Sequence, residues 1–496
     1  MSSITEITAM CKNGQVHKAY ELAKIDMEQQ LPWAQREMGW ALYYLIKGDT
    51  ETANYQLLLT HIDELKALDQ LTIPNDNMIF ENVLFKIAEF VKAHVSPTGI
   101  DSPAKLSTLF SKLKDYNFDS SKGYSFLLQS FIKCSNWQDM ADFLDWWNLD
   151  KLTPDDFVPY KMGNGRTVMS VAERAFIAKS KALLQLNNLG RIEEFLPQMD
   201  DLMENHPEMT YPGYFYGKML LSLGGTQEEA LRVILPFARK KATEFWVWQL
   251  LSDAFINESE KQLACLLRAV NCKTQENFLG KVRIKLATLY IQRSQLDYAK
   301  HQIDKVTQCY LSQGWRLPYE VDCWIHQPWI NSVTPNSNTP IDYITITNDI
   351  LCAGTEEAIA IVTHVDRNSH KATLVYGYEV RMVQRLRINV VGSGVVLRIN
   401  YITEADGNLR LLSAGQTRFP ATLDYAKIVE GTIRKRIDKN FAFLKTKDGD
   451  YYIAPNLVKK YNLQNSESVK SLIVYDYNKR NEAWGWICVS INKKTN

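Results

Sequence analysis

The sequence predicts a multidomain α + β protein, in which a long array of helices precedes two small β domains. Up to about residue 313, apolar residues recur at spacings of three and four, which is typical of amphipathic helices. From residue 356 onward, short segments alternate apolar and polar residues or stay apolar over the length of a strand. The chain of 496 residues is long enough for two to four domains.

The composition is that of a globular protein in a reducing compartment. Hydrophobic residues make up 46% of the chain and charged residues 23%, which are ordinary values. The eight cysteines are scattered and form no Cys-x-x-Cys pair, which argues against a disulfide scaffold. We find no secretion signal in the first residues and no apolar run long enough to span a membrane. We therefore expect a cytoplasmic protein without a membrane partner.

Charge is distributed unevenly along a chain whose formal net charge is only +1. Residues 425–496 contain fourteen Lys and Arg against seven Asp and Glu, a net charge of +7. Residues 356–424 carry +1, and the first 355 residues therefore carry −7. An acidic body and a basic end usually serve different partners.

The helical part, residues 1–313, shows an internal spacing of 34 residues. The spacing separates small residues in three pairs: Gly14 and Gly48, Ala19 and Ala53, and Ala230 and Ala264. In a second pattern, a small residue is followed by an aromatic residue at the third position and by an alanine at the twelfth position, both counted from the small residue. Ala287, Tyr290 and Ala299 are an example. This part resembles tetratricopeptide repeats. The resemblance implies an α-solenoid of helical hairpins whose surface docks a protein partner.

A segment rich in Trp and Pro, residues 314–355, follows the helices. Its prolines exclude one long helix, and it is too apolar for a free linker. We interpret it as an ordered connector in which Trp315, Trp324 and Trp329 pack across a domain seam.

The C-terminal β domain, residues 424–493, combines aromatic residues with cations. Phe441 and Phe443 are two residues apart, so a strand would place them on one face. A hairpin-type turn at residues 447–449 precedes a second strand, which brings Tyr452 beside them. Such an arrangement suits single-stranded nucleic acid, because bases stack on rings and phosphates bind cations. The cations nearby are Arg434, Lys435, Arg436, Lys439 and Lys445.

Three stretches of this domain match motifs of a known family: residues 431–433, 439–444 and 451–455, which read GTI, KNFAFL and YYIAP. With them the domain resembles a cold-shock domain, a five-stranded barrel of the OB class. The resemblance implies that Phe441, Phe443 and Tyr452 form a platform on which bases stack.

The first β domain, residues 356–420, looks like a more distant relative of the same fold, so the fold class includes two small OB/cold-shock-like barrels. Its first motif aligns with residues 370–375, where Ala372 and Leu374 occupy the aromatic places. We expect a structural or docking role for it. The alternative is binding through a different surface, formed by Tyr376, Tyr378, Arg381 and Arg385.

No enzyme motif is present in the sequence. It lacks a phosphate-binding loop, a His-Glu-x-x-His motif and paired zinc-ligand spacings, and we expect neither catalysis nor a metal or cofactor. The sequence predicts a non-catalytic adaptor that binds single-stranded nucleic acid, with RNA favoured over DNA, while its helices dock a protein. One alternative is a protein-interaction scaffold whose barrels are docking modules that bind no nucleic acid. Another is an enzyme with an unrecognised site on the concave face of the helices.

Overall fold

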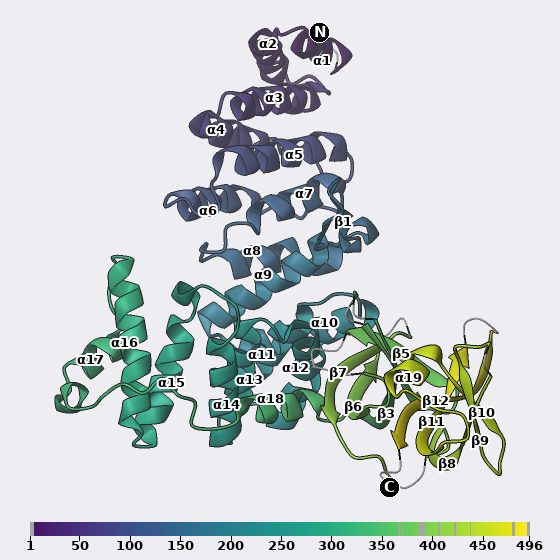
Figure 1. Cartoon of the computed structure of the whole chain (residues 1–496). Coiled ribbons are helices and arrows are strands. Elements are labelled where there is room, and N and C mark those ends of the chain that lie inside the picture. Colours follow the sequence, from purple (N-terminus) through teal and green to yellow (C-terminus); the bar gives the residue numbers. More distant parts are fainter. Residues whose placement is uncertain are drawn as a thin grey trace. The chain divides into compact units, whose positions relative to one another are not determined.

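The computed structural model describes residues 4–366, 368–369, 371–385, 392–404, 407–420, 423–436, 438–478 and 482–493. Helices precede strands along the chain, which confirms the predicted α + β order (Figure 1). The chain divides into two compact units: Met1–Lys241 with Asp253–Ile256, and Ala242–Ser252 with Asn257–Asn496. His370, at the start of the motif expected in the first β domain, lies outside the described residues.

The first unit is made of helices that lie in successive layers (Figure 1). Sequence neighbours pack on each other from α1 to α4 and from α8 to α12. Alternate helices also touch, so that α3 contacts α5, α5 contacts α7 and α7 contacts α9. The bounds of its helices are α1 (Ile4–Lys12), α2 (Val16–Glu28), α3 (Ala34–Glu51), α4 (Tyr55–Lys66), α5 (Asn77–His94), α6 (Ser102–Leu113), α7 (Lys122–Phe131), α8 (Met140–Trp147), α9 (Val171–Leu186), α10 (Leu189–Asn205), α11 (Pro212–Ser222) and α12 (Gln227–Lys241). A short hairpin of β1 (Tyr160–Lys161) and β2 (Thr167–Val168) precedes α9.

Some of the small residues lie where the helices approach each other, and others, such as Gly14, lie at exposed positions. Ala19 and Ala41 are fully buried in the core of this unit, as close packing of helices requires. Ala53 differs, because it is exposed in the turn between α3 and α4 and has a positive φ of 58°. Ala19 and Ala53, which are 34 residues apart, therefore occupy different positions: Ala19 packs between helices and Ala53 lies in a turn.

The second unit begins with helices and continues into the strands. Its helices are α14 (Ser259–Val270), α15 (Gly280–Gln292), α16 (Leu296–Ser312), α17 (Tyr319–Ile325) and α18 (Tyr343–Cys352), and α13 (Phe245–Ala254) lies where the two units divide. Within the described residues, none of the helices has both the length and the apolar character needed to cross a bilayer.

The Trp-rich connector is ordered but packs differently from the expectation. Trp324 and Trp329 pack on a core formed by α15, α16 and the connector itself, and Trp315 contacts Tyr310 of α16. These side chains therefore cover the last long helix pair. Contact between the helices and the strands is made by α18, which touches β7.

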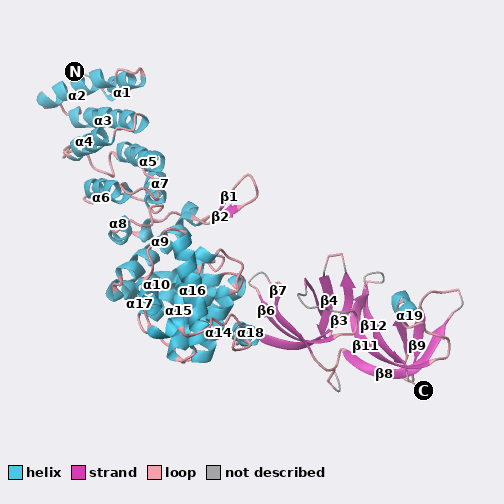
Figure 2. Ribbon diagram, turned by 60° about the vertical axis from the view of Figure 1, so that its left-hand side comes forward, coloured by secondary structure: helices cyan, strands magenta, loops and turns pink. Residues whose placement is uncertain are grey.

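The first β domain is an antiparallel sheet in the order β5-β4-β3-β6-β7, here called the first sheet (Figure 2). Its strands are β3 (Glu356–Asp366), β4 (Lys371–Gly377), β5 (Val380–Arg385), β6 (Val396–Thr403) and β7 (Leu409–Gln416). The expectation was a closed barrel, but the described strands form an open ladder. A side chain bridges the two edges, since Gln384 Nε2 donates to the Leu409 carbonyl at 2.9 Å.

The second β domain is a closed five-stranded barrel in the order β10-β12-β11-β8-β9, here called the C-terminal barrel, as the sequence predicted. Its strands are β8 (Ala426–Lys435), β9 (Ala442–Lys445), β10 (Asp450–Ile453), β11 (Ser468–Asn478) and β12 (Ala483–Lys493), and α19 (Pro455–Lys460) follows β10. Ile433, Leu444, Ile453, Val469 and Ile473 fill its core. Parallel pairing of Tyr452 with Ile487 closes the barrel.

The first sheet and the C-terminal barrel share a hydrophobic core. Ile361 and Val375 of the first sheet and Val474 of the barrel are fully buried in one cluster. The Tyr425 hydroxyl, at the start of the barrel, donates to the Ile359 carbonyl of the first sheet. One side of the barrel is thus covered by protein, and any ligand must use the remainder.

Because Leu444 is fully buried and Phe443 faces outward, we predict opposite outcomes for their truncation. Leu444→Ala should reduce the local free energy of unfolding of β9 and β10 by about 2–5 kcal/mol, the usual cost of a core cavity. Phe443→Ala should cost less than about 1 kcal/mol. Amide hydrogen exchange of β9 and β10 in the full chain measures both. Equal acceleration of exchange in the two variants would contradict the strand orientation described here.

Candidate nucleic-acid interface

Strand alternation in β9 and β10 turns three aromatic rings away from the barrel core. Ala442 and Leu444 are buried inside, so Phe443 between them points outward and is half-exposed. Tyr452 is likewise half-exposed between two buried neighbours, Tyr451 and Ile453. Phe441, just before β9, is also half-exposed, as the two-residue period expects.

The three rings support one another and form a single surface, here called the aromatic platform (Phe441, Phe443 and Tyr452). Phe443 and Tyr452 are directly opposite each other across β9 and β10. The ring centroids of Phe441 and Phe443 are 5.7 Å apart and those of Phe443 and Tyr452 6.0 Å apart, with edge-to-face geometry. Phe441 and Tyr452 are 5.7 Å apart and tilted by 44°. Mutual packing at these distances restricts the rings before any ligand arrives.

Two of the predicted cations share the face of the platform. Arg434 of β8 is directly opposite Phe443 and is exposed, and Lys445 lies two residues after Phe443 on the same strand face. An acidic group is also present there, because the Asp450 carboxylate lies 3.9 Å from Arg434 Nη1. At that distance in solvent the pair is weak, so both cations remain accessible to phosphates.

The remaining predicted cations lie around the platform and not on it. Lys435 follows Arg434, so its side chain leaves the opposite side of β8, and its backbone N–H donates to Asn465 Oδ1 at 3.0 Å. Arg436 and Lys439 lie in the connection between β8 and β9 and are exposed. The structure thus brings Arg434 and Lys445 to the rings and leaves Arg436 and Lys439 at the border.

A second group of aromatic rings lies where the barrel meets the first sheet. Tyr378 of the first sheet stacks on Tyr475 of β11 at 4.6 Å, and Trp484 of β12 lies 6.1 Å from Tyr475 with nearly parallel rings. Tyr376, Tyr378 and Arg381 were expected to belong to the alternative binding surface of the first β domain. Tyr376 is buried, whereas Tyr378 and Arg381 lie at the boundary between the first sheet and the barrel. Sequence reasoning did not connect these rings, because they come from strands about 100 residues apart.

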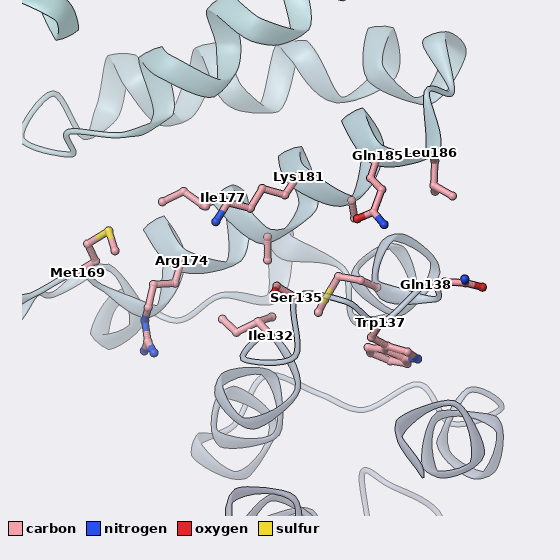
Figure 3. Close-up of a pocket in the computed structure, with 13 residues that line it drawn as sticks. Ile132, Ser135, Trp137, Gln138, Met169, Arg174, Ile177, Lys181, Gln185 and Leu186 are labelled. Atoms are coloured by element: carbon pink, nitrogen blue, oxygen red, sulfur yellow. The ribbon is translucent and has the colours of Figure 1, made fainter. Parts of the chain in front are cut away.

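A pocket of about 430 Å³ opens in the first unit, beside α9 (Figure 3). Arg174, Ile177, Lys181 and Gln185 project from α9 toward the segment that joins α7 to α8. The lining contains two cations and several apolar side chains, and it contains neither a carboxylate nor a histidine. It is formed by Ile132, Ser135, Trp137, Gln138, Met140, Met169, Arg174, Ile177, Ala178, Lys181, Ala182, Gln185 and Leu186.

Two further lysines, Lys92 and Lys133, line a smaller pocket of about 90 Å³, and Arg174 lies close enough to Lys133 for their charges to interact. We call the two pockets together the basic groove and name it by its four cations, Lys92, Lys133, Arg174 and Lys181. Burial lowers the pKa of Lys133, and the positive charges of Lys92 and Arg174 lower it further. Burial also lowers the pKa of Arg174, whose Nε donates to the Ser170 carbonyl at 3.4 Å. Among the described residues, no carboxylate lies within 4.0 Å of these four cations. Lys133 lies 41 residues after Lys92 and 41 residues before Arg174 in the sequence. This repeated spacing could have revealed the groove.

Family comparisons match two parts of the chain. Residues 427–491 match the family described as S1/CSD-like domain 2 of the TOTE conflict systems, and this range contains the aromatic platform. Residues 210–347 match a domain of unknown function, DUF7017. No curated protein matches the sequence. The C-terminal barrel is therefore similar to an S1/cold-shock-like domain, while residues 210–347, from α11 to α18, are similar to a family without an assigned role.

Proposed function

We propose that this protein is a non-catalytic adaptor that binds single-stranded nucleic acid, RNA in preference to DNA, through its C-terminal barrel. The observation that carries the proposal is the outward orientation of three mutually packed rings on a barrel face that also bears Arg434 and Lys445. The similarity of residues 427–491 to an S1/CSD-like domain supports it. Because that family is described from the TOTE conflict systems, we also propose that the protein belongs to a conflict system of the same kind.

The chemistry of the platform favours unpaired bases over a duplex. A base can stack on an exposed ring only if it is not paired and stacked inside a helix. Each base stacked on an aromatic ring contributes about 1–3 kcal/mol, largely without sequence preference. Phosphates that contact Arg434 and Lys445 add a salt-dependent contribution.

The helical part supplies the adaptor function in this proposal: it forms an α-solenoid that docks an acidic segment of a partner protein in the basic groove. Met169, Ile177 and Leu186 offer apolar surface in the pocket, and Arg174 and Lys181 offer uncompensated charge. A segment with carboxylates and apolar side chains would satisfy both. The absence of carboxylates and histidines from this lining supports a binding role over a catalytic one.

The second candidate function is a scaffold whose barrels only dock protein. The hydrophobic core between the first sheet and the barrel favours it, because this core shows that the barrel surface can bind protein. The two functions differ in what covers the aromatic platform: bases in the first and a protein surface in the second.

The nucleic-acid proposal predicts that the double variant Phe441→Ala/Phe443→Ala loses affinity for a fluorescein-labelled uridine dodecamer. Loss of two stacking surfaces should weaken binding at least roughly 30-fold at low salt, because each contributes about 1–3 kcal/mol. Fluorescence anisotropy with the full chain measures it, and a deoxythymidine dodecamer tests the preference for RNA. Tyr319→Ala is the matched control, since Tyr319 is a ring with 81% exposure outside the barrel. Failure of the unmodified protein to bind either oligonucleotide at low salt would leave the scaffold as the function.

The docking proposal predicts that Arg174→Glu/Lys181→Glu weakens binding of an acidic peptide at least tenfold. A labelled twelve-residue peptide that alternates glutamate and leucine is a suitable probe, and its affinity should also fall with added salt. Lys112→Glu is the control, because Lys112 already pairs with Asp63 at 2.6 Å elsewhere in the first unit. Equal affinity of the control and the groove variant for the peptide would argue against docking in the groove.

A further inference from the structure

A cleft of about 510 Å³ lies between the first sheet and the C-terminal barrel, and it borders the aromatic platform. Its volume is in the range of pockets that bind nucleotide-sized ligands. Tyr452 belongs both to the platform and to the wall of the cleft. A strand whose bases stack on Phe441 and Phe443 would therefore bring its next base to the cleft. The lining consists of His364 from β3, Tyr452, Ala454 and Pro455 around the end of β10, Asp476, Tyr477 and Asn478 from β11, and Ile487 and Cys488 from β12.

The cleft contains a buried carboxylate with unused hydrogen-bonding capacity. Asp476 is only 7% exposed, yet it lines the cleft. Its Oδ1 accepts from the Tyr477 backbone N–H at 2.7 Å and from Arg381 Nη1 at 3.4 Å. Within the described residues, Oδ2 accepts no hydrogen bond. Both lone pairs of Oδ2 are therefore available, so a ligand that supplies donors can bind this carboxylate.

The position of Asp476 is fixed by contacts from both β domains. Arg381 of the first sheet also donates to the Tyr477 carbonyl at 3.1 Å, and its guanidinium lies 5.0 Å from the centre of the Tyr477 ring. Arg381 therefore holds the end of β11 and offsets the negative charge of Asp476 toward a phosphate backbone. The carboxylate is thus prepared to accept hydrogen bonds without rearrangement.

We propose that this cleft is a base-specific subsite that accepts guanine and reads it through Asp476; the inference rests on the proposed binding of single-stranded nucleic acid to the platform. Guanine presents two adjacent donors, N1–H and the N2 amino group, and the two lone pairs of Oδ2 can accept from both. Uracil presents one N–H between two carbonyl oxygens, and these oxygens face repulsion from the carboxylate. Adenine and cytosine each present a single amino donor on their Watson–Crick edge. Their affinity for the subsite should therefore lie between that of guanine and that of uracil.

The test compares the full chain with uridine dodecamers that carry no substitution, one central guanosine or one central inosine. We expect the guanosine oligonucleotide to bind roughly 5- to 150-fold more tightly than the uridine one, as good two-donor base recognition provides. Inosine lacks the N2 amino group, so its affinity should fall between the two. This comparison needs no variant and cannot be obscured by misfolding.

The variant Asp476→Asn should lower the affinity for the guanosine oligonucleotide to that for the all-uridine dodecamer, because the amide lacks the negative charge and offers only one acceptor oxygen. Binding of the all-uridine dodecamer should not weaken, because its carbonyl oxygens no longer meet a carboxylate, and this retained binding also shows that the barrel and its platform remain folded. Equal affinity of the unmodified protein for all three oligonucleotides, or a guanosine preference that survives Asp476→Asn, would overturn the subsite alone. Absence of binding to all three would instead overturn the proposed function.

Discussion

The two-residue alternation of β9 and β10 fixes both the core and the outer face of the C-terminal barrel. The same strands that place Leu444 and Ile453 in the barrel core must place Phe443 and Tyr452 outside it. A shift of one residue in either strand would bury the rings and expose the aliphatic core, so register and function are fixed together. Burial of the aliphatic side chains thus stabilises the barrel and holds the platform at once.

In the second unit, one side of the barrel packs on the first sheet and another side carries the aromatic platform. Val474 and its neighbours pack on the first sheet, and the platform lies on the part that this packing leaves uncovered. Tyr452 lies where the two meet, beside the cleft that contains Asp476. The first sheet, which lacks aromatic residues at the places expected for stacking, contributes His364 to the cleft lining and Arg381 to the support of Asp476.

The features that could be predicted from the sequence are those that depend on residues close together in the chain. The outward rings follow from a period of two, and the helices follow from spacings of three and four. The cleft could not be predicted, because Arg381 and Asp476 meet across 95 residues and no motif links them. The turn position of Ala53 also escaped prediction, since an alanine with a positive φ has no signature in the sequence. The first β domain was expected to be a closed barrel, and the open ladder of its described strands depends on long-range pairing of the same kind.

The central claim is that the three outward rings contact unpaired bases, and photo-crosslinking tests it most directly. A single-stranded RNA that contains 4-thiouridine is irradiated with the full chain, and the modified peptides are identified by mass spectrometry. We expect crosslinks within residues 441–452, at the aromatic platform. Crosslinks confined to other parts of the chain, with the platform peptides unmodified, would contradict it.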